Sequence, residues 1–124
     1  MDITADNFEA NLDLIKKSIH SADFIAFDSE FSGLSIDFED KQHDYDTVED
    51  KYQKVKHNCS RMNAFQFGVT TFKWDEKAYK YVMRPFNFYV FPNSQIMDKK
   101  VMQFDTSCIN FLMQNKFDFN KLFT

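Results

Sequence analysis

The chain has 124 residues, which allows one domain with a modest core, and its 16 Phe and 5 Tyr supply much of the apolar area for that core. Only 2 Gly and 2 Pro argue against a disordered chain. The net charge of −4 disfavours a stand-alone module that holds nucleic acid by bulk electrostatics, but it is compatible with an active site bridged by metal ions.

Cysteine usage and the N-terminal sequence indicate the compartment. Cys59 and Cys108 lack the spacing of a zinc site, so reduced thiols are expected. The first six residues carry acid where a signal peptide carries base, and no apolar run approaches the ~20 residues that span a bilayer. We expect a soluble intracellular protein, in the nucleus, the cytoplasm or both, without a membrane partner.

The first predicted elements are a helix and a strand. Asp6 and Glu9 have the spacing of a capping box, and the apolar face of the helix over about 7–20 follows at helical spacing: Phe8, Leu12, Ile15 and Ile19. Residues 23–28 form the first strand. Because residues 24–27 are continuously apolar, both faces of that strand should be covered, which predicts a central position in the sheet.

A polar segment over about 35–61 follows the strand as an insertion. It includes a short helix that is capped by Asp46 or Thr47 and runs to about Asn58, with Tyr52 and Val55 as its buried positions. Insertions of this kind shape a substrate cleft or form an inert surface excursion, and the sequence leaves both open.

Two strands and a helix complete the pattern. Strands over 64–73 and 79–91 flank a turn at 74–77, and Pro85 within the second strand predicts a bulge or an edge. The last predicted helix is capped by a residue among 105–107 and runs to about 115, with three buried positions: Ile109, Leu112 and Met113.

An Asp-x-Glu triplet ends the first strand. Successive strand side chains alternate between faces, so Asp28 and Glu30 lie on one face, where a divalent cation would relieve their repulsion. The other explanation is a solvated strand end. A second triplet, Asp37 and Glu39, lies in a polar loop and is not favoured as a metal site.

Further blocks along the chain resemble the poly(A)-specific ribonucleases, deadenylases of the superfamily of 3′-5′ exonucleases with four catalytic acids. The blocks are DSEFSG at 28–33, YDT at 45–47, YQK at 52–54, FQFG at 65–68, FNFYVFP at 86–92 and FDFNK at 117–121. The resemblance implies an α/β, ribonuclease-H-like exonuclease fold in the order helix, strand, insertion, hairpin, helix. Residues 1–124 would be the N-terminal part of that domain, an incomplete fold with the three-stranded antiparallel part of a mixed sheet.

The resemblance also implies a catalytic role for the first triplet. Asp28 and Glu30 would ligate Mg²⁺ in a two-metal site, of which the chain holds half of the ligands. The remaining acids and the general base of the family lie beyond residue 124, so the isolated chain is expected to be an inactive fragment. The three histidines match no catalytic position and are expected at the surface: His20, His43 and His57.

The substrate implied by the resemblance is the single-stranded 3′ end of poly(A) RNA. Five residues match positions that line the pocket for the terminal nucleotides: Phe31, Ser32, Leu34, Ile109 and Phe111. For the last two, which lie on a helix, burial in the core is the competing explanation. The alternative function is that of a truncated, non-catalytic paralogue that acts as a protein-interaction module, and a homodimer is a further candidate assembly.

Overall fold

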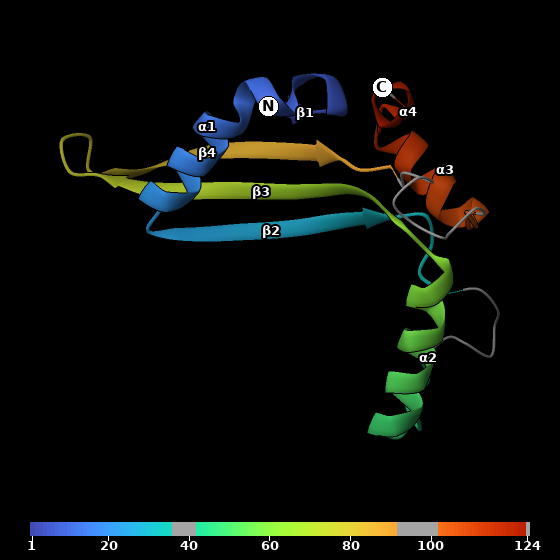
Figure 1. Ribbon diagram of the computed structural model, residues 1–124. Helices are drawn as coiled ribbons and strands as arrows, with labels where there is room; N and C mark the ends of the chain where they lie inside the picture. The colour runs from blue at the N-terminus through green and yellow to red at the C-terminus, as the bar shows by residue number, and fades with distance from the viewer. Residues whose placement is uncertain (36–41, 92–101, 124) are drawn as a thin grey trace. The chain divides into compact units, whose positions relative to one another are not determined.

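The computed structural model describes residues 1–35, 42–91 and 102–123, which belong to two compact units. The first, here the sheet unit, comprises Met1–Glu30, Phe65–Phe91 and Phe119–Thr124. The second, here the helical unit, comprises Phe31–Ala64 and Pro92–Asp118 and contains the predicted insertion. Figure 1 shows the elements of each unit, which are described separately.

The sheet unit holds four strands in the order β1-β4-β3-β2. They are β1 (Asp2–Ile3), β2 (Phe24–Phe31), β3 (Ala64–Asp75) and β4 (Lys80–Tyr89). β3 and β4 are antiparallel, β1 is parallel to β4, and β2 runs opposite to β3 (Figure 1). The three antiparallel strands and the α/β class are as predicted. β1 was not predicted, because two residues are too short to show an alternating pattern.

Pro85 lies in β4 without a bulge. The pairing of β3 with β4 is continuous from Gln66 opposite Tyr89 to Asp75 opposite Lys80. The N–H of Asn87 donates to Met1 O, and the Met1 amine donates to Pro85 O, so the nitrogen of Pro85 faces this outer edge of β4. The proline therefore removes no bond from the β3–β4 ladder, and it also lies outside the pairing with β1, which involves only Asn87 and Phe88.

Helix α1 (Ala5–Ser21) contributes to the core of the sheet unit, where Ile3, Ile15 and Phe86 are buried and Phe88 packs against them. The predicted start of this helix was wrong by two residues. Thr4 is the N-cap, and its N–H donates to Asn7 Oδ1 over 3.1 Å. The amide of Asn7 thus fills the role that the sequence pattern assigned to Glu9.

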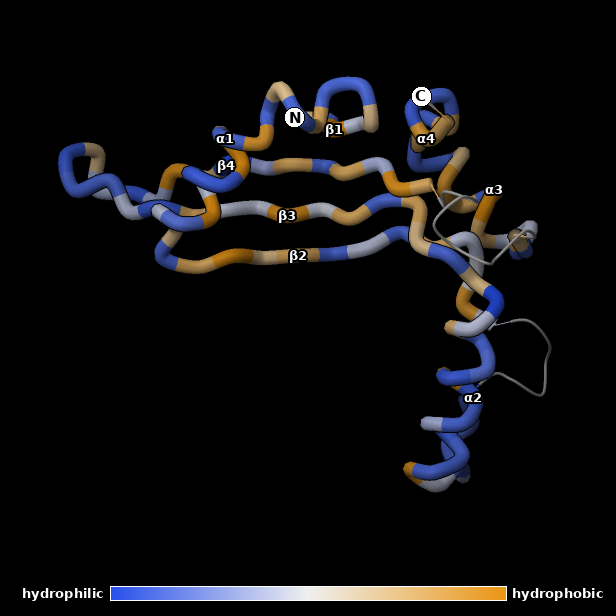
Figure 2. The backbone as a smooth tube through the Cα atoms, in the orientation of Figure 1, coloured by the Kyte–Doolittle hydropathy of each residue, from blue (hydrophilic) through white to orange (hydrophobic). Residues whose placement is uncertain are grey.

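Among the described residues β2 lies at the edge of the sheet, so they do not supply the second neighbouring strand that its predicted central position requires. Only β3 pairs with it, and Phe24, Ile25 and Phe27 are exposed, with 74% of Phe27 accessible. Figure 2 shows β2 changing from hydrophobic at its start to hydrophilic at its end. A continuous apolar run predicts the need for cover on both faces, but it does not say which segment supplies that cover.

The helical unit contains α2 (Val48–Arg61) and α3 (Thr106–Gln114). Thr47 caps α2 as predicted: its Oγ1 accepts the N–H of Asp50 over 3.1 Å, and the Asp50 carboxylate accepts the N–H of Thr47 over 3.0 Å. Tyr52 and Val55 were predicted to be buried but are exposed, and Asn58 is the buried residue of α2. Most of the helix surface is polar, so only a narrow face is available for packing.

Asp105 caps α3, since its carboxylate accepts the N–H of Ser107 over 2.8 Å. Leu112 is buried and Ile109 half-buried as the pattern predicted, but Met113 is exposed. One residue turns a helix by about 100°, which carries Met113 away from the face of Leu112. A short helix, α4 (Phe119–Leu122), was not predicted.

No helix in residues 1–35, 42–91 and 102–123 combines the length and the apolar character that a membrane crossing needs.

Candidate metal and substrate site

Asp28 and Glu30 lie on one face of the sheet, in a hollow of about 280 Å³ within the sheet unit. β3 contributes Gln66, Gly68 and Thr70 to this hollow, and β4 contributes Asn87. The register places Gly68 opposite Asn87. Because side chains alternate between the two faces along a strand, Gln66, Thr70 and Asn87 project from the same face. The predicted pair, Asp28 and Glu30, therefore lies in one hollow with polar side chains of β3 and β4.

The alternation of residue types along β3 predicts the polar lining of this hollow, which the Asp-x-Glu spacing alone does not. In β3 the residues between Phe65, Phe67 and Val69 are polar or small, and these are the ones that line the hollow. Gly68 adds no side chain to the hollow, and a Cβ there would be in ordinary van der Waals contact, 3.7 Å from Asp28 O and 3.8 Å from Asn87 Oδ1.

The two carboxylates of the pair have no cationic partner among the described residues. Asp28 Oδ1 accepts the N–H of Ser29 over 2.9 Å. Desolvation, and then the negative charge of Asp28, raise the pKa of Glu30 above its usual value. A cation placed between the two groups would oppose both effects, since an opposite charge favours the ionised form of a carboxylate.

The carboxylates of Asp28 and Glu30 fit part of the ligand set of a magnesium site. Carboxylate oxygens are the hard ligands that Mg²⁺ prefers, and the ion usually keeps several waters beside one or two carboxylates. Within the part of the chain that the structure describes, no three His, Cys, Asp or Glu side chains gather as a metal cluster. The second triplet, Asp37 and Glu39, lies outside the described residues.

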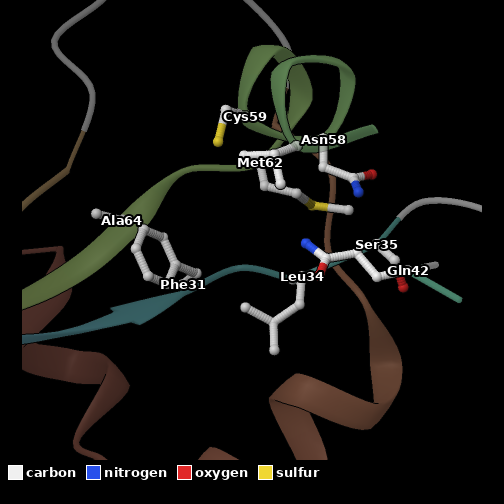
Figure 3. A pocket seen from close by; sticks show the side chains of 10 residues that line it. Phe31, Leu34, Ser35, Gln42, Asn58, Cys59, Met62 and Ala64 are labelled. Atoms are coloured by element: carbon white, nitrogen blue, oxygen red, sulfur yellow. The ribbon is translucent and has the colours of Figure 1, made fainter. Parts of the chain in front are cut away.

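A second cavity lies in the helical unit, with a volume of about 510 Å³ (Figure 3). Phe31 and Leu34, two of the predicted substrate residues, line it, and both are exposed, at 42% and 70%. α2 lines another side through Val55 and Cys59. The sequence analysis did not assign α2 to a pocket, although Val55, Cys59 and Met62 recur there at helical spacing.

Ser32 does not line this cavity but is fully buried beside it. Its Oγ accepts the N–H of Asn63 over 3.0 Å, and its N–H donates to Asn63 O over 2.7 Å. Its carbonyl accepts the N–H of Asp105 over 2.8 Å. The structure thus gives Ser32 a role in holding the helical unit together, and its predicted contact with substrate stays a prediction.

The remaining predicted residues, Ile109 and Phe111, are not among those that line the cavity of the helical unit. Ile109 is half-buried and Phe111 is 57% exposed on α3, and neither lines the cavity of Figure 3. Their predicted role is untested by this geometry. Of the histidines, His20 and His57 are exposed, whereas His43 is half-buried and stacks on Tyr45 with ring centroids 5.1 Å apart.

Comparison with known proteins identifies the family to which this chain belongs. The family of CAF1 ribonucleases matches residues 3–124, and the chain belongs to this family. It is 42% identical over 128 residues to poly(A)-specific ribonuclease PARN of Xenopus laevis, a match that covers 99% of this chain and 20% of the other protein.

Two further relatives also match nearly the whole length of this chain. PARN of Homo sapiens is 41% identical over 127 residues, and the pre-piRNA 3′-exonuclease trimmer of Bombyx mori is 36% identical over 121 residues. The matches cover 99% and 98% of this chain but 20% and 23% of those proteins. The chain therefore spans about a fifth of the length of these relatives.

A solved structure has the same fold. S. pombe Pop2p, in a form with Mg²⁺ and Mn²⁺ bound, superposes with a TM-score of 0.68 at 18% identity, over 98% of this chain and 45% of that protein. This agreement confirms the ribonuclease-H-like exonuclease fold that the sequence predicted.

Proposed function

We propose that this chain supplies two carboxylates, Asp28 and Glu30, to the metal site of a 3′-5′ exoribonuclease that shortens poly(A) tails. The observation that carries the proposal is the pair itself: two acids on one open polar face with no cationic partner among the described residues. Names of the relatives support the reaction and the substrate, and the bound Mg²⁺ and Mn²⁺ of Pop2p support a divalent ion.

We infer the roles of individual residues in such a site from their positions in the sheet. Pairing of β2 with β3 fixes the backbone of Asp28 and Glu30, so both side chains project from one face of the sheet before any ion binds. When bound, Mg²⁺ would stabilise negative charge on the attacking and leaving oxygens of an in-line displacement. The missing side chain of Gly68 leaves room beside Asp28 for a close approach of substrate.

The cavity of the helical unit suits a nucleobase of the RNA 3′ end. Phe31 presents an aromatic face and Leu34 an apolar surface, and stacking of a base on an aromatic side chain contributes about 1–3 kcal/mol. This stacking accepts any base, so a preference for adenine requires polar contacts as well. Asn58 and Gln42 are the amides of the lining that could supply them.

Because Asp28 and Glu30 provide only part of the ligands for two ions, we expect the isolated chain to leave labelled oligo(A) at full length in Mg²⁺. A chimera gives the positive test, in which this chain replaces the matching 128 residues of the Xenopus enzyme. The chimera should remove adenylates from the 3′ end, and Asp28→Asn or Glu30→Gln should abolish the activity, with Asp44→Asn as a control of equal charge change.

The alternative, a non-catalytic interaction module, is favoured by one observation: apolar side chains of β2 are exposed. The same chimera separates the two functions. A folded chimera with no activity, whose β2 still binds another protein, would refute the nuclease proposal and support the interaction module.

A further inference from the structure

A groove of about 700 Å³ lies between the second half of α1 and the β3–β4 hairpin, within the sheet unit. Thr71, Lys73 and Arg84 line it from the strands, and Lys17 and Ser18 from α1. Thr71 pairs with Arg84 in the ladder, three positions along β3 from Gly68, which lies opposite Asn87. The offset of three positions is odd and side chains alternate along a strand, so the groove and the carboxylate pair lie on opposite faces of one sheet.

The groove concentrates positive charge on a chain whose net charge is −4. Four cations line it, with two carboxylates at the turn: Lys17, Lys73, Lys77 and Arg84, with Asp75 and Glu76. Lys73 contacts Asp23 over 3.4 Å, and Asp75 Oδ1 accepts the N–H groups of Lys77 and Ala78. Lys17, Lys77 and Arg84 have no carboxylate partner in the part of the chain that the structure describes.

Arg84 is held in position at the wall of the groove. Its Nη1 donates to Ser18 Oγ over 3.0 Å, and the same hydroxyl donates to Leu14 O over 2.7 Å. Ser18 is 5% exposed, so this anchor is buried while Arg84 is exposed. A guanidinium that is fixed through one N–H still presents others in a planar fork, the geometry that matches a phosphate.

We propose that this groove binds backbone phosphates of single-stranded RNA, at nucleotides other than those at the carboxylate pair. The inference rests on the proposed function for the identity of the anion. Lys and Arg side chains are the usual partners of phosphate oxygens, and both types line the groove. The cations come from α1, β3, the turn and β4, so four segments of the sheet unit contribute positive charge to one groove.

An acidic peptide is the competing occupant, and the lining favours RNA. Apolar side chains that could anchor a peptide are few, namely Leu14 and Val82, whereas Trp74 adds an indole on which a base can stack. The acidic net charge of the chain repels RNA elsewhere, so a local site is needed to hold the strand.

The test is the affinity of the chain for a fluorescein-labelled 12-nucleotide oligo(A) in EDTA, so that binding is independent of the proposed metal site. The groove variant is Lys17→Gln/Lys77→Gln. The matched control is Lys51→Gln/Lys56→Gln on α2, which removes two exposed lysines and the same net charge. Thermal melts verify that both variants are folded.

The groove variant should bind about tenfold more weakly, and its slope of log K against log salt should be smaller by about 1.4, since each lost phosphate contact accounts for about 0.7. The control should keep the affinity and the slope of the unmodified chain. Equal weakening by both variants, or no binding by the unmodified chain at low salt, would overturn the proposal.

Two further outcomes are informative. Loss of binding to an oligo-Glu peptide with unchanged RNA binding in the groove variant would overturn the proposal in favour of the peptide. A failure of Mn²⁺ binding at Asp28 and Glu30 would refute the proposed function alone, because the groove assay contains no divalent ion.

Discussion

The backbone N–H of Asp105 donates to the carbonyl of Ser32 over 2.8 Å, which ties the N-cap of α3 to the segment that follows β2. Gly33 lies at this junction, and a Cβ there would lie 2.9 Å from Asp105 Cβ and 2.8 Å from Met62 Sδ. This contact explains why the residue after Ser32 is glycine: a side chain would push α3 away from its anchor.

Gly33→Ala and Gly68→Ala should therefore have opposite effects on stability. The first overpacks the junction, at a cost of about 1–3 kcal/mol, since Asp105 Cβ cannot move without the backbone. The second places a methyl group in ordinary contact and should stabilise β3 by about 0.5–1 kcal/mol, because glycine is disfavoured in strands. Urea unfolding of both variants checks the prediction, and equal losses would contradict it.

Ser32→Ala should destabilise the helical unit by about 1–3 kcal/mol, because the N–H of Asn63 loses its acceptor. Ser35→Ala is the control, since the Ser35 hydroxyl has no hydrogen bond among the described residues. Unfolding midpoints of the two variants give the comparison. Wild-type stability in Ser32→Ala combined with weaker RNA binding would show that Ser32 contacts substrate instead.

The start of α2 should respond to acid through Asp46. Its side chain is 6% exposed, and it accepts the N–H of His43 over 2.8 Å and the Lys54 Nζ over 2.9 Å, which lower its pKa below the usual 3.8. A lowered pKa in the folded state contributes stability above about pH 4, and this contribution is lost as pH falls through the lowered value.

Asp46→Asn should reduce that acid dependence, whereas Asp44→Asn, at an exposed neighbour, should leave it unchanged. Helix content followed by circular dichroism from pH 6 to pH 2 measures the effect. A steeper acid transition in Asp46→Asn than in the unmodified chain would contradict the assignment.

β2 should make the isolated chain self-associate. It pairs on one side with β3, and exposed Phe27 lies against Phe67 with ring centroids 5.9 Å apart. Edges of this kind template further pairing, and a lysine on the edge opposes it. Phe27→Lys should lower the proportion of dimers and larger species in light scattering, with binding of a hydrophobic dye reduced in parallel. A dye-silent monomer for the unmodified chain would refute this prediction.

The sequence predicted the main elements because their signals are local. Apolar spacing located α1, α2 and α3, and the cap of α2 at Thr47 follows from a hydroxyl and an acid three residues apart. The predictions that were wrong concern burial, which depends on packing between segments that are distant in the sequence. Tyr52 and Met113 have apolar or aromatic side chains at helical positions, but no described residue covers them.

The site shows the same division. The spacing of Asp28 and Glu30 on a strand fixes their common face, and the structure has them on that face. Gln66 and Asn87 line the same hollow because of the pairing register of β3 with β4, and the Asp-x-Glu motif carries no information on that register. Ser32 matched a family position for substrate, yet only the structure could reveal that its hydroxyl is engaged with Asn63.

The central claim, that Asp28 and Glu30 bind a divalent ion together, is tested most directly by titration of the chain with Mn²⁺ under NMR detection. Paramagnetic broadening should begin at the amides of β2 near Asp28 and at Gly68 and Asn87 across the hollow, and Asp28→Asn/Glu30→Gln should abolish it. Excess Mg²⁺ should restore the signals, since both ions prefer carboxylate oxygens. Broadening that centres on residues 43–50 instead, or that persists in the double variant, would contradict the account.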